Sequence, residues 1–277
     1  MRVYGCAVSA EVDLSVVIPA YNEEKRLPAT LGAIERYLGE RAGSYEIIVV
    51  DDGSHDRTVD IVREAHKRNP CIRAVALPDN RGKGRAVATG VAATRGRFLL
   101  ITDADLSTPI EELEKLMWAL EAGADIVIAS RGSRESEEIE QPLQRMLMGK
   151  TFNLLVQVLL LPGLWDTQCG FKLFRGDQAR QLFTELRTDG FAFDVEILYR
   201  GRRHGLIVLE VPVRWVHSAP SRVAPVKHSL QMLKDLVNIR LAGAGRTQRA
   251  LTPPAGALEP GHRRGVEDLA RREYPVR

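Results

Sequence analysis

Residues 98–105 read FLLITDAD, an apolar run that ends in two aspartates one residue apart. An apolar run this short that stops at polar residues predicts a buried strand followed by a loop. Similar runs that end in polar or turn-forming residues recur at 13–18, 46–50, 72–77 and 124–129. The stretches between them, such as 27–38, carry apolar residues at helical spacing. Strands that alternate with helices in this way predict an α/β fold with a mainly parallel central sheet and helices on both faces.

The second half of the chain carries a weaker pattern. Apolar residues alternate with other residues over 207–213, which predicts a strand, and Pro212 favours a sheet edge because proline cannot donate to the ladder. The C-terminal residues are rich in Arg, Pro, Gly and Ala with little periodicity, which is typical of disorder. We therefore expect an N-terminal extension over 1–12, a folded domain over 13–242 and a mostly disordered basic tail over 243–277.

The composition is that of a globular protein, with 277 residues of which 44% are hydrophobic and 27% charged. The net charge of +3 is too small to predict nucleic-acid binding. The longest apolar stretch, 152–165, is shorter than the about 20 residues that a membrane-spanning helix needs, and we expect no signal peptide. Three widely separated cysteines without a CxxC pair predict no zinc site and no disulfide framework, which favours a reducing, cytoplasmic location.

The carboxyl ends of the strands are where such sheets bind ligands, and here they carry acidic residues. Asp51 and Asp52 end one strand, while Asp103 and Asp105 follow another. Two carboxylates one residue apart at a strand end can hold one hard cation, and oxygen ligands favour Mg²⁺ or Mn²⁺. The alternative is a solvated turn, which is what an isolated DxD pattern most often forms. The second acidic pair, at another strand end, favours a site for a metal-bound diphosphate.

Two further segments are candidates for binding. Residues 80–85, NRGKGR, form a basic glycine-containing loop before a helix, and its N–H groups and Lys83 suit a phosphate. A solvated turn is the alternative there. Residues 166–172, DTQCGFK, follow the apolar stretch, and their composition alone predicts a buried structural turn with an inert Cys169.

Several of these segments together resemble a known family. The runs that carry the resemblance are VVIPAYNEEKRLPATL (16–31), IIVVDDGSHDRT (47–58), NRGKGRAVATG (80–90), LLITDADLSTP (99–109) and IVIASR (126–131). In this order they resemble the nucleotide-sugar domain of family 2 glycosyltransferases. Three further segments resemble the polyprenyl-phosphate branch of this family, which includes dolichyl-phosphate β-glucosyltransferases. They are DTQCGFKLF (166–174), FAFDVEILY (191–199) and PSRV (220–223). The resemblance implies a GT-A-type, Rossmann-like nucleotide-diphospho-sugar transferase fold, with a donor half over 13–131 and an acceptor half over 132–242.

The resemblance also implies roles for individual residues. Those that match the donor-nucleotide site are Pro19, Tyr21, Glu23, Asp51, Asp52, Lys83 and Asp103. Asp105 matches the metal ligand, with Asp103 as a second ligand or a contact of the ribose or the sugar. The positions that match the catalytic centre are Asp103, Asp105, Arg131 and Asp166, and those on the sugar and acceptor side are Gln168, Cys169 and Arg222. Arg131 is expected to face the diphosphate or the acceptor phosphate.

Two positions depart from the family pattern. Ser107 stands where mannosyl relatives have a glutamine that contacts the metal, so the third metal ligand is left open, with water as the alternative. Arg222 stands where lysine is usual, and its guanidinium can still bind a phosphate in a bidentate way.

The activity that the resemblance implies is an inverting transfer of a hexose, most simply glucose, from a UDP-sugar to a polyprenyl or dolichyl monophosphate. A divalent cation, Mg²⁺ or Mn²⁺, would neutralise charge on the departing UDP. The acceptor phosphate is largely dianionic at neutral pH and attacks the sugar without a strong general base. A family 2 enzyme with a soluble acceptor, either a phosphorylated metabolite or a polysaccharide, is the alternative.

A lipid acceptor would explain the apolar helix expected over 146–164. Six of its apolar residues, together with Arg145 and Lys150, are expected to lie in the membrane interface. The six are Met146, Leu147, Phe152, Leu155, Leu159 and Leu160. A core helix or a dimer face is the alternative, and homo-oligomer formation is left open. We therefore expect peripheral attachment to the cytoplasmic face of a membrane, assisted by the basic tail.

Overall fold

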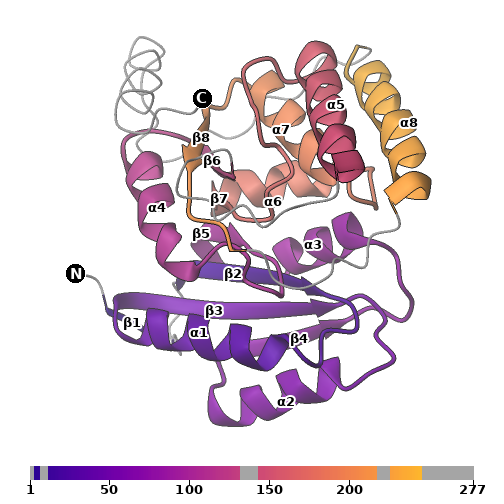
Figure 1. Cartoon of the computed structure of the whole chain (residues 1–277). Helices are drawn as coiled ribbons and strands as arrows, with labels where there is room; N and C mark the ends of the chain where they lie inside the picture. The colour runs from indigo at the N-terminus through magenta and orange to yellow at the C-terminus, as the bar shows by residue number, and fades with distance from the viewer. Residues whose placement is uncertain (1–2, 7–11, 132–142, 217–224, 245–277) are drawn as a thin grey trace.

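Figure 1 shows the computed structural model of the chain, which describes residues 3–6, 12–131, 143–216 and 225–244. An eight-stranded sheet within these residues forms the centre of the domain. Its strands are β1 (Val3–Cys6), β2 (Val12–Ala20), β3 (Ala42–Asp51), β4 (Ile72–Ala76), β5 (Gly96–Ile101), β6 (Ile126–Ser130), β7 (Lys172–Arg175) and β8 (Val208–Pro212). They lie in the order β1-β3-β2-β5-β7-β6-β8, with β4 also paired to β3.

β7 runs antiparallel to its neighbours β5 and β6, whereas the other strand pairs described are parallel. The predicted mainly parallel sheet is therefore confirmed, and β8 lies at an edge, as Pro212 indicated. Because β7 is reversed, its start rather than its end lies beside the carboxyl ends of β5 and β6. The segment before Lys172 consequently reaches the same edge of the sheet as the loops that follow the parallel strands.

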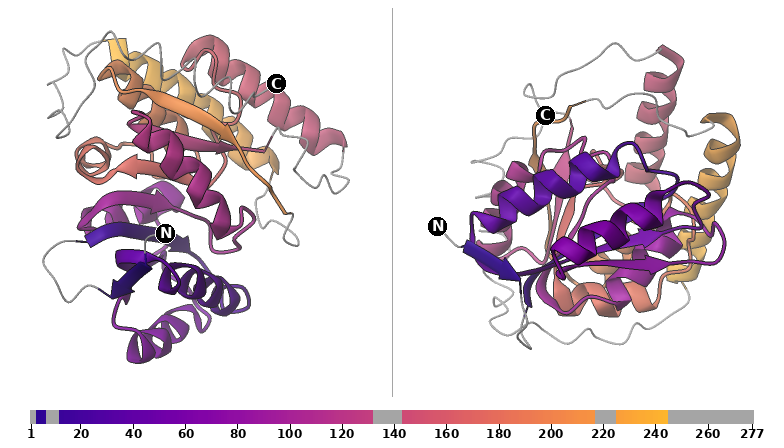
Figure 2. Two further views of the ribbon diagram at one scale, coloured as in Figure 1. Left: turned by 90° about the vertical axis from the view of Figure 1, so that its left-hand side faces the viewer. Right: turned by 90° about the horizontal axis from the view of Figure 1, so that it is seen from below.

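Helices cover both faces of the sheet (Figure 1; Figure 2). One face carries α1 (Leu27–Gly39), α2 (Thr58–Arg68), the short 3₁₀ helix η1 (Ile110–Glu112) and α4 (Leu113–Glu121). The other face carries α3 (Lys83–Ala92), α5 (Leu143–Leu159), α6 (Gly176–Thr184), α7 (Phe193–Arg203) and α8 (Pro225–Ala244). Successive side chains of a strand point to opposite faces, so Val16 and Ile18 of β2 pack in the first hydrophobic cluster and Val17 packs in the second.

The ends of the domain and its cysteines add detail that the sequence pattern did not show. Residues 3–6, within the expected N-terminal extension, add strand β1 beside β3. α8 continues to Ala244, so the first two residues of the tail predicted over 243–277 are helical, and residues 245–277 lie outside the described residues. Cys71 is disulfide-bonded and Cys169 is free and buried, so one cysteine forms a disulfide although the spacing predicted no disulfide framework. Spacing along the chain does not show which cysteines the sheet brings together.

Candidate active site

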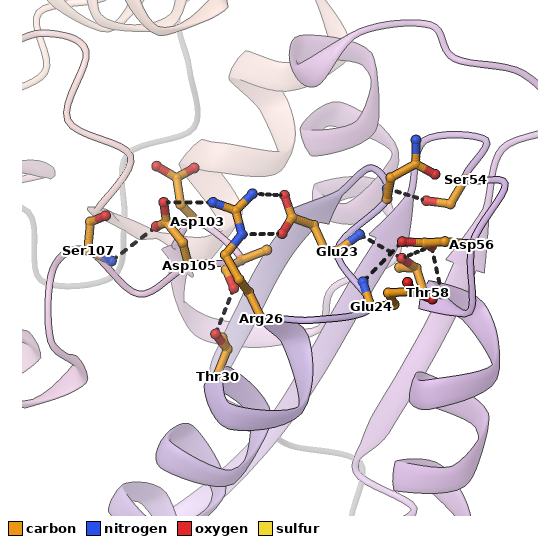
Figure 3. A network of polar contacts seen from close by, with 12 residues as sticks. Glu23, Glu24, Arg26, Thr30, Ser54, Asp56, Thr58, Asp103, Asp105 and Ser107 are labelled. Carbon is orange, nitrogen blue, oxygen red and sulfur yellow. Dashed lines mark hydrogen bonds and ion pairs between the residues drawn. The ribbon is translucent and has the colours of Figure 1, made fainter. Parts of the chain in front are cut away.

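The loops after β2 and β3 are bonded to each other and form one side of the site (Figure 3). Asn22 adopts a left-handed backbone conformation with a φ of 56°, and its N–H donates to the Ser54 hydroxyl at 2.8 Å. The N–H of Glu23 likewise donates to the Thr58 hydroxyl at 2.8 Å. These bonds fix the backbone after β2 and leave the Tyr21 side chain exposed. The loop after β3 therefore holds the donor-site candidates in the loop after β2 in place.

The two aspartates at the end of β3 have different environments. Asp52 is buried and accepts hydrogen bonds from the N–H groups of Arg81 (2.8 Å) and Gly82 (2.9 Å), so it anchors the basic loop. Burial raises the pKa of Asp52, and these two bonds offset that effect only in part. Asp51 is also buried, but within the described residues its Oδ1 accepts no hydrogen bond. A buried acceptor without a donor costs free energy, and a ligand N–H would satisfy it.

Lys83 and Asp103 form a close ion pair between the start of α3 and the end of β5. The distance from Lys83 Nζ to Asp103 Oδ1 is 2.6 Å. Burial alone would lower the pKa of Lys83, but the carboxylates of Asp103 and Asp194 raise it overall. Burial would raise the pKa of Asp103, but neighbouring cations, with Lys83 first among them, lower it overall. Both groups are thus charged at neutral pH.

Gly170 lies directly against Asp103, and the sequence analysis did not single it out. A Cβ atom on Gly170 would lie 2.0 Å from Asp103 Oδ2 and 2.4 Å from Asp103 Cγ. A side chain at this position would displace the Asp103 carboxylate. The glycine in DTQCGF was the available signal, and the structure shows that the segment before β7 packs on the DxD loop.

Asp105 is the less constrained carboxylate of the DxD motif. Its Oδ1 accepts the N–H of Ser107 at 3.1 Å, and its Oδ2 lies 3.7 Å from Arg26 Nη1. Arg26 is itself bonded in a bidentate way to Glu23 (Figure 3). Glu23, a candidate for the donor site, therefore orients the cation that faces Asp105.

The residues of the DxD loop fit a divalent cation that is shared with a substrate. Among the described residues, no group of three or more His, Cys, Asp or Glu side chains could hold a metal alone. Asp105 nevertheless offers a hard oxygen ligand that is 24% exposed and not in close contact with Arg26. Mg²⁺ is commonly bound by one or two carboxylates together with substrate phosphates and water. Asp105 fits this arrangement better than Asp103, whose carboxylate is held by Lys83.

Arg131 and Asp166 form a bidentate ion pair where β6 ends. Arg131 Nε and Nη2 each lie 2.8 Å from an Asp166 carboxylate oxygen, and the Arg131 N–H donates to the same carboxylate at 2.9 Å. Burial would raise the pKa of Asp166, but Arg131 lowers it overall. The guanidinium also lies 5.9 Å from the centre of the Trp215 ring. The pair is therefore ionised and fixed in orientation.

The remaining predicted residues have less defined places. Pro19 lies in β2 opposite Val50 of β3. Gln168 is half-buried, and Cys169 is buried with a free thiol whose pKa is raised by burial. Arg222 lies outside the described residues. The structure thus brings the donor and acceptor candidates to one sheet edge, and it says nothing of Arg222.

Two charged residues that the sequence analysis left without a role lie beside this site. Lys172 and Asp194 are both buried, with Lys172 Nζ 2.6 Å from Asp194 Oδ1. They stand in the segments DTQCGFK and FAFDVEILY. A charged residue within an apolar run was the available signal in both segments, because such residues are rarely buried without a partner.

Comparison with known proteins agrees with this geometry. Residues 15–183 match the family model described as Glycosyl transferase family 2. Dolichyl-phosphate beta-glucosyltransferase of Dictyostelium discoideum is 39% identical over 240 residues, which cover 82% of this chain and 73% of that protein. The Homo sapiens protein of the same name is 39% identical over 253 residues, which cover 85% of this chain and 78% of that protein.

Solved structures with similar folds confirm the architecture. Glucosyl-3-phosphoglycerate synthase from Mycobacterium tuberculosis, in complex with Mn²⁺, UDP-glucose and phosphoglyceric acid, gives a TM-score of 0.62 at 22% identity, over 86% of this chain and 82% of that chain. Mannosyl-3-phosphoglycerate synthase from Rubrobacter xylanophilus gives a TM-score of 0.62 at 19% identity, over 88% and 78%. At this identity the likeness shows the fold alone, and the predicted Rossmann-like transferase fold is confirmed.

Proposed function

The chain belongs to glycosyl transferase family 2, and on that premise we propose that it transfers glucose from UDP-glucose to a polyprenyl or dolichyl monophosphate. One observation carries the proposal: Arg26, Lys83 and Arg131 surround the DxD motif, and each is held by a carboxylate. Both substrates bring phosphate to this place, the donor as a diphosphate and the acceptor as a monophosphate. The names of relatives at 39% identity support glucose as the sugar and the lipid phosphate as the acceptor.

The donor nucleotide fits the loops after β2 and β3. Asp51 Oδ1 is a buried acceptor with no donor in the described part of the chain, and the N–H of a uracil base would satisfy it. The exposed ring of Tyr21 can stack on a base or ribose. Asp52 holds the loop before α3, so the helix N-terminus and Lys83 are placed for the diphosphate.

In the proposed reaction, an oxygen of the acceptor phosphate forms a bond to C1 of glucose as the bond from C1 to the UDP oxygen breaks. The electron pair of the broken bond leaves with UDP, and attack from the opposite face converts an α-linked donor into a β-linked product. A phosphate monoester has its second pKa near about 6, so the nucleophile is already deprotonated at neutral pH. Asp166 is ionised as well, and its role is to orient Arg131 toward an acceptor phosphate.

A divalent cation bound at Asp105, with Asp103 as a second contact, would neutralise charge on the leaving diphosphate. The chain adds positive charge of its own on the same side, because Glu23 holds Arg26 at 3.7 Å from Asp105. Lys83 adds a second fixed cation beside Asp103. Both cations are oriented before the substrate arrives, which lowers the cost of reorganisation during the reaction.

The proposed acceptor resides in a membrane, so we also propose peripheral binding to the cytoplasmic membrane face. No helix that the structure describes has the length and apolar character needed to cross a bilayer. α5 and α8 pack side by side (Figure 1) and expose apolar side chains at helical spacing. These residues, called the α5–α8 face below, are Leu154 and Val158 of α5 and Leu233, Val237 and Leu241 of α8.

This face differs in part from the one expected from the sequence. Leu160, which follows α5, is buried, and Phe152 and Leu155 of α5 pack against the second hydrophobic cluster. Leu159 is exposed, as expected. The side chains of Arg145, Met146, Leu147 and Lys150 lie outside those described.

Transfer of radiolabelled glucose from UDP-glucose to a short-chain polyprenyl phosphate, with Mg²⁺ or Mn²⁺, tests the proposal. We expect metal-dependent labelling of the lipid in the wild type and its loss in Asp105→Ala. Labelling of a water-soluble acceptor instead, with no lipid product, would contradict the proposed acceptor while keeping the donor. The absence of any UDP release from UDP-glucose would contradict the donor.

A further inference from the structure

Lys172 lies on an internal strand of the sheet, next to the end of the strand that precedes the DxD motif. As the first residue of β7, it pairs with Ile101 of β5 on one side and with Ile128 of β6 on the other. Asp103 follows Ile101 by two residues, and Arg131 follows Ile128 by three. Lys172 therefore stands where the two strands that deliver the donor-side and acceptor-side groups come to an end.

The Lys172 ammonium connects two separate segments of the chain. Its Nζ lies 2.6 Å from Asp194 Oδ1, and the two side chains are 2% and 6% exposed. The same Nζ donates to the carbonyl oxygen of Cys169. Asp194 lies in the first turn of α7, so the ammonium ties α7 to the segment that carries Asp166 and Gly170.

Stability alone does not explain why two charges are buried here. Removing two charged groups from water is costly, and replacing such a pair by uncharged side chains of similar size is often neutral or stabilising. The location of the pair is more informative, because the charge of Lys172 lowers the pKa of both Asp103 and Asp166. The ammonium is thus electrostatically linked to the donor side and the acceptor side at once.

We propose that Lys172 and Asp194 are positioning residues for glycosyl transfer, which hold the segment from Asp166 to Gly170 at a fixed distance from Asp103. Gly170 transmits the position, because its Cα packs against the Asp103 carboxylate with no room for a side chain. The inference rests on the proposed function only in placing the transfer reaction at this edge of the sheet. Both side chains are buried away from the surface where substrates bind, so the effect is expected in the rate of transfer rather than in donor binding.

The test is the double substitution K172M/D194N, which removes both charges with little change in volume and leaves no unpaired charge in the interior. The matched control is E46Q/R73M, which removes the 2.7 Å ion pair between buried Glu46 and Arg73, away from the carboxyl ends of the strands. Steady-state transfer from UDP-glucose to polyprenyl phosphate gives kcat and the donor KM. Thermal unfolding reports the fold, and UDP release without lipid is measured in parallel.

We expect K172M/D194N to lose about 100-fold in kcat, the usual effect of a 1 Å displacement of reacting groups, with little change in donor KM or melting temperature. E46Q/R73M is expected to keep the wild-type kcat. A wild-type kcat in K172M/D194N would overturn the positioning role and leave the pair a structural contact.

If K172M/D194N does not fold, Asp194→Glu replaces it, because this variant keeps both charges and moves the ammonium. A lowered kcat at unchanged donor KM then supports the positioning role, and an unchanged kcat in the folded variant overturns it. Wild-type protein that does not label the lipid contradicts the proposed acceptor instead. In that case UDP release from UDP-glucose is compared between wild type and variants, and equal rates overturn the positioning role.

Discussion

Replacing Gly170 by alanine is expected to disable transfer while the fold is kept. The new Cβ would lie 2.0 Å from Asp103 Oδ2 and 2.7 Å from Asp103 Oδ1. The new Cβ would also lie 2.4 Å from Asp103 Cγ, and since non-bonded carbon atoms normally approach to about 3.5 Å, the carboxylate has to move by about 1.1 Å. This movement breaks the 2.6 Å contact with Lys83 Nζ. The fold tolerates the change because the clashing atoms belong to the end of a side chain rather than to the backbone.

The size of the effect follows from the displacement. Misplacing a reacting group by 1 Å costs about 100-fold, so we expect kcat/KM of Gly170→Ala to fall by at least about 100-fold. This factor corresponds to about 2.7 kcal/mol of lost transition-state stabilisation. The assay is transfer of labelled glucose to polyprenyl phosphate, with thermal unfolding as the measure of folding.

Gly190→Ala is the matched control for this substitution. A Cβ on Gly190 would meet no atom within 4 Å, although Gly190 lies close to the loop before α3. Its kcat/KM is expected to equal that of the wild type. If Gly170→Ala is folded and has a wild-type kcat/KM, the contact between Gly170 and Asp103 has no part in the reaction and the reasoning is refuted.

Further substitutions test the metal, the acceptor side and the membrane face. Asp105→Ala is expected to lose at least about 100-fold in kcat and its response to Mg²⁺ or Mn²⁺, which a metal titration measures. Arg131→Lys keeps the charge but loses the bidentate contact with Asp166, so the KM for the lipid phosphate is expected to rise about tenfold; an unchanged KM would remove Arg131 from the acceptor site. The pKa of Asp166 lies below its unfolded value of about 3.9, so its stabilisation is complete above that pH and is lost as the pH falls through the folded value. Urea unfolding at neutral and acid pH should therefore show a smaller acid loss of stability in Asp166→Asn than in the wild type. The double substitution V237D/L241D is expected to reduce sedimentation with anionic vesicles while UDP release is kept, and equal sedimentation would contradict the α5–α8 face.

The strand ends could be predicted from the sequence because a buried strand and the polar residue after it form one local pattern. Asp51, Asp103 and Arg131 each follow an apolar run, and the structure places each at the carboxyl edge of the sheet. Their partners could not be predicted from this pattern. The order of β2, β3 and β5 in the sheet brings Lys83 and Asp103 together. The hydrophobic periodicity of a single segment does not show in which order the strands pair.

Three residues that the sequence analysis missed, Gly170, Lys172 and Asp194, depend on β7 for their place in the site. This strand is four residues long, and its hydrophobic pattern is the same for either direction. The position of Lys172 behind the active site follows from the reversal of β7, since a parallel strand would place its start at the opposite edge. The expectation for Leu160 was wrong for a related reason: residues 152–160 are apolar on more than one side, and only packing shows which of them face the core.

Lys83 and Arg131 are each held by a carboxylate of the chain, and this has a consequence for two substrates of the same charge. A diphosphate and a phosphate dianion repel each other, so a site that brings them together needs fixed positive charge near both. Lys83 supplies it beside Asp103, and Arg131 supplies it beside Asp166. The carboxylates keep these side chains in one orientation before the substrates bind.

The two aspartates of the DxD motif then have different tasks. Asp103 is 38% exposed, but its Oδ1 lies 2.6 Å from Lys83 Nζ and its carboxylate packs against Gly170, so it can only be a second contact of the metal. Asp105 has a looser contact, since its Oδ2 lies 3.7 Å from Arg26 Nη1, a distance at which a cation bound to a diphosphate can compete for the carboxylate. Asp105→Asn should therefore weaken metal activation, whereas Asp103→Asn should release Lys83 and lower the rate at every metal concentration. A titration in which both variants show the same loss of metal affinity would contradict this division.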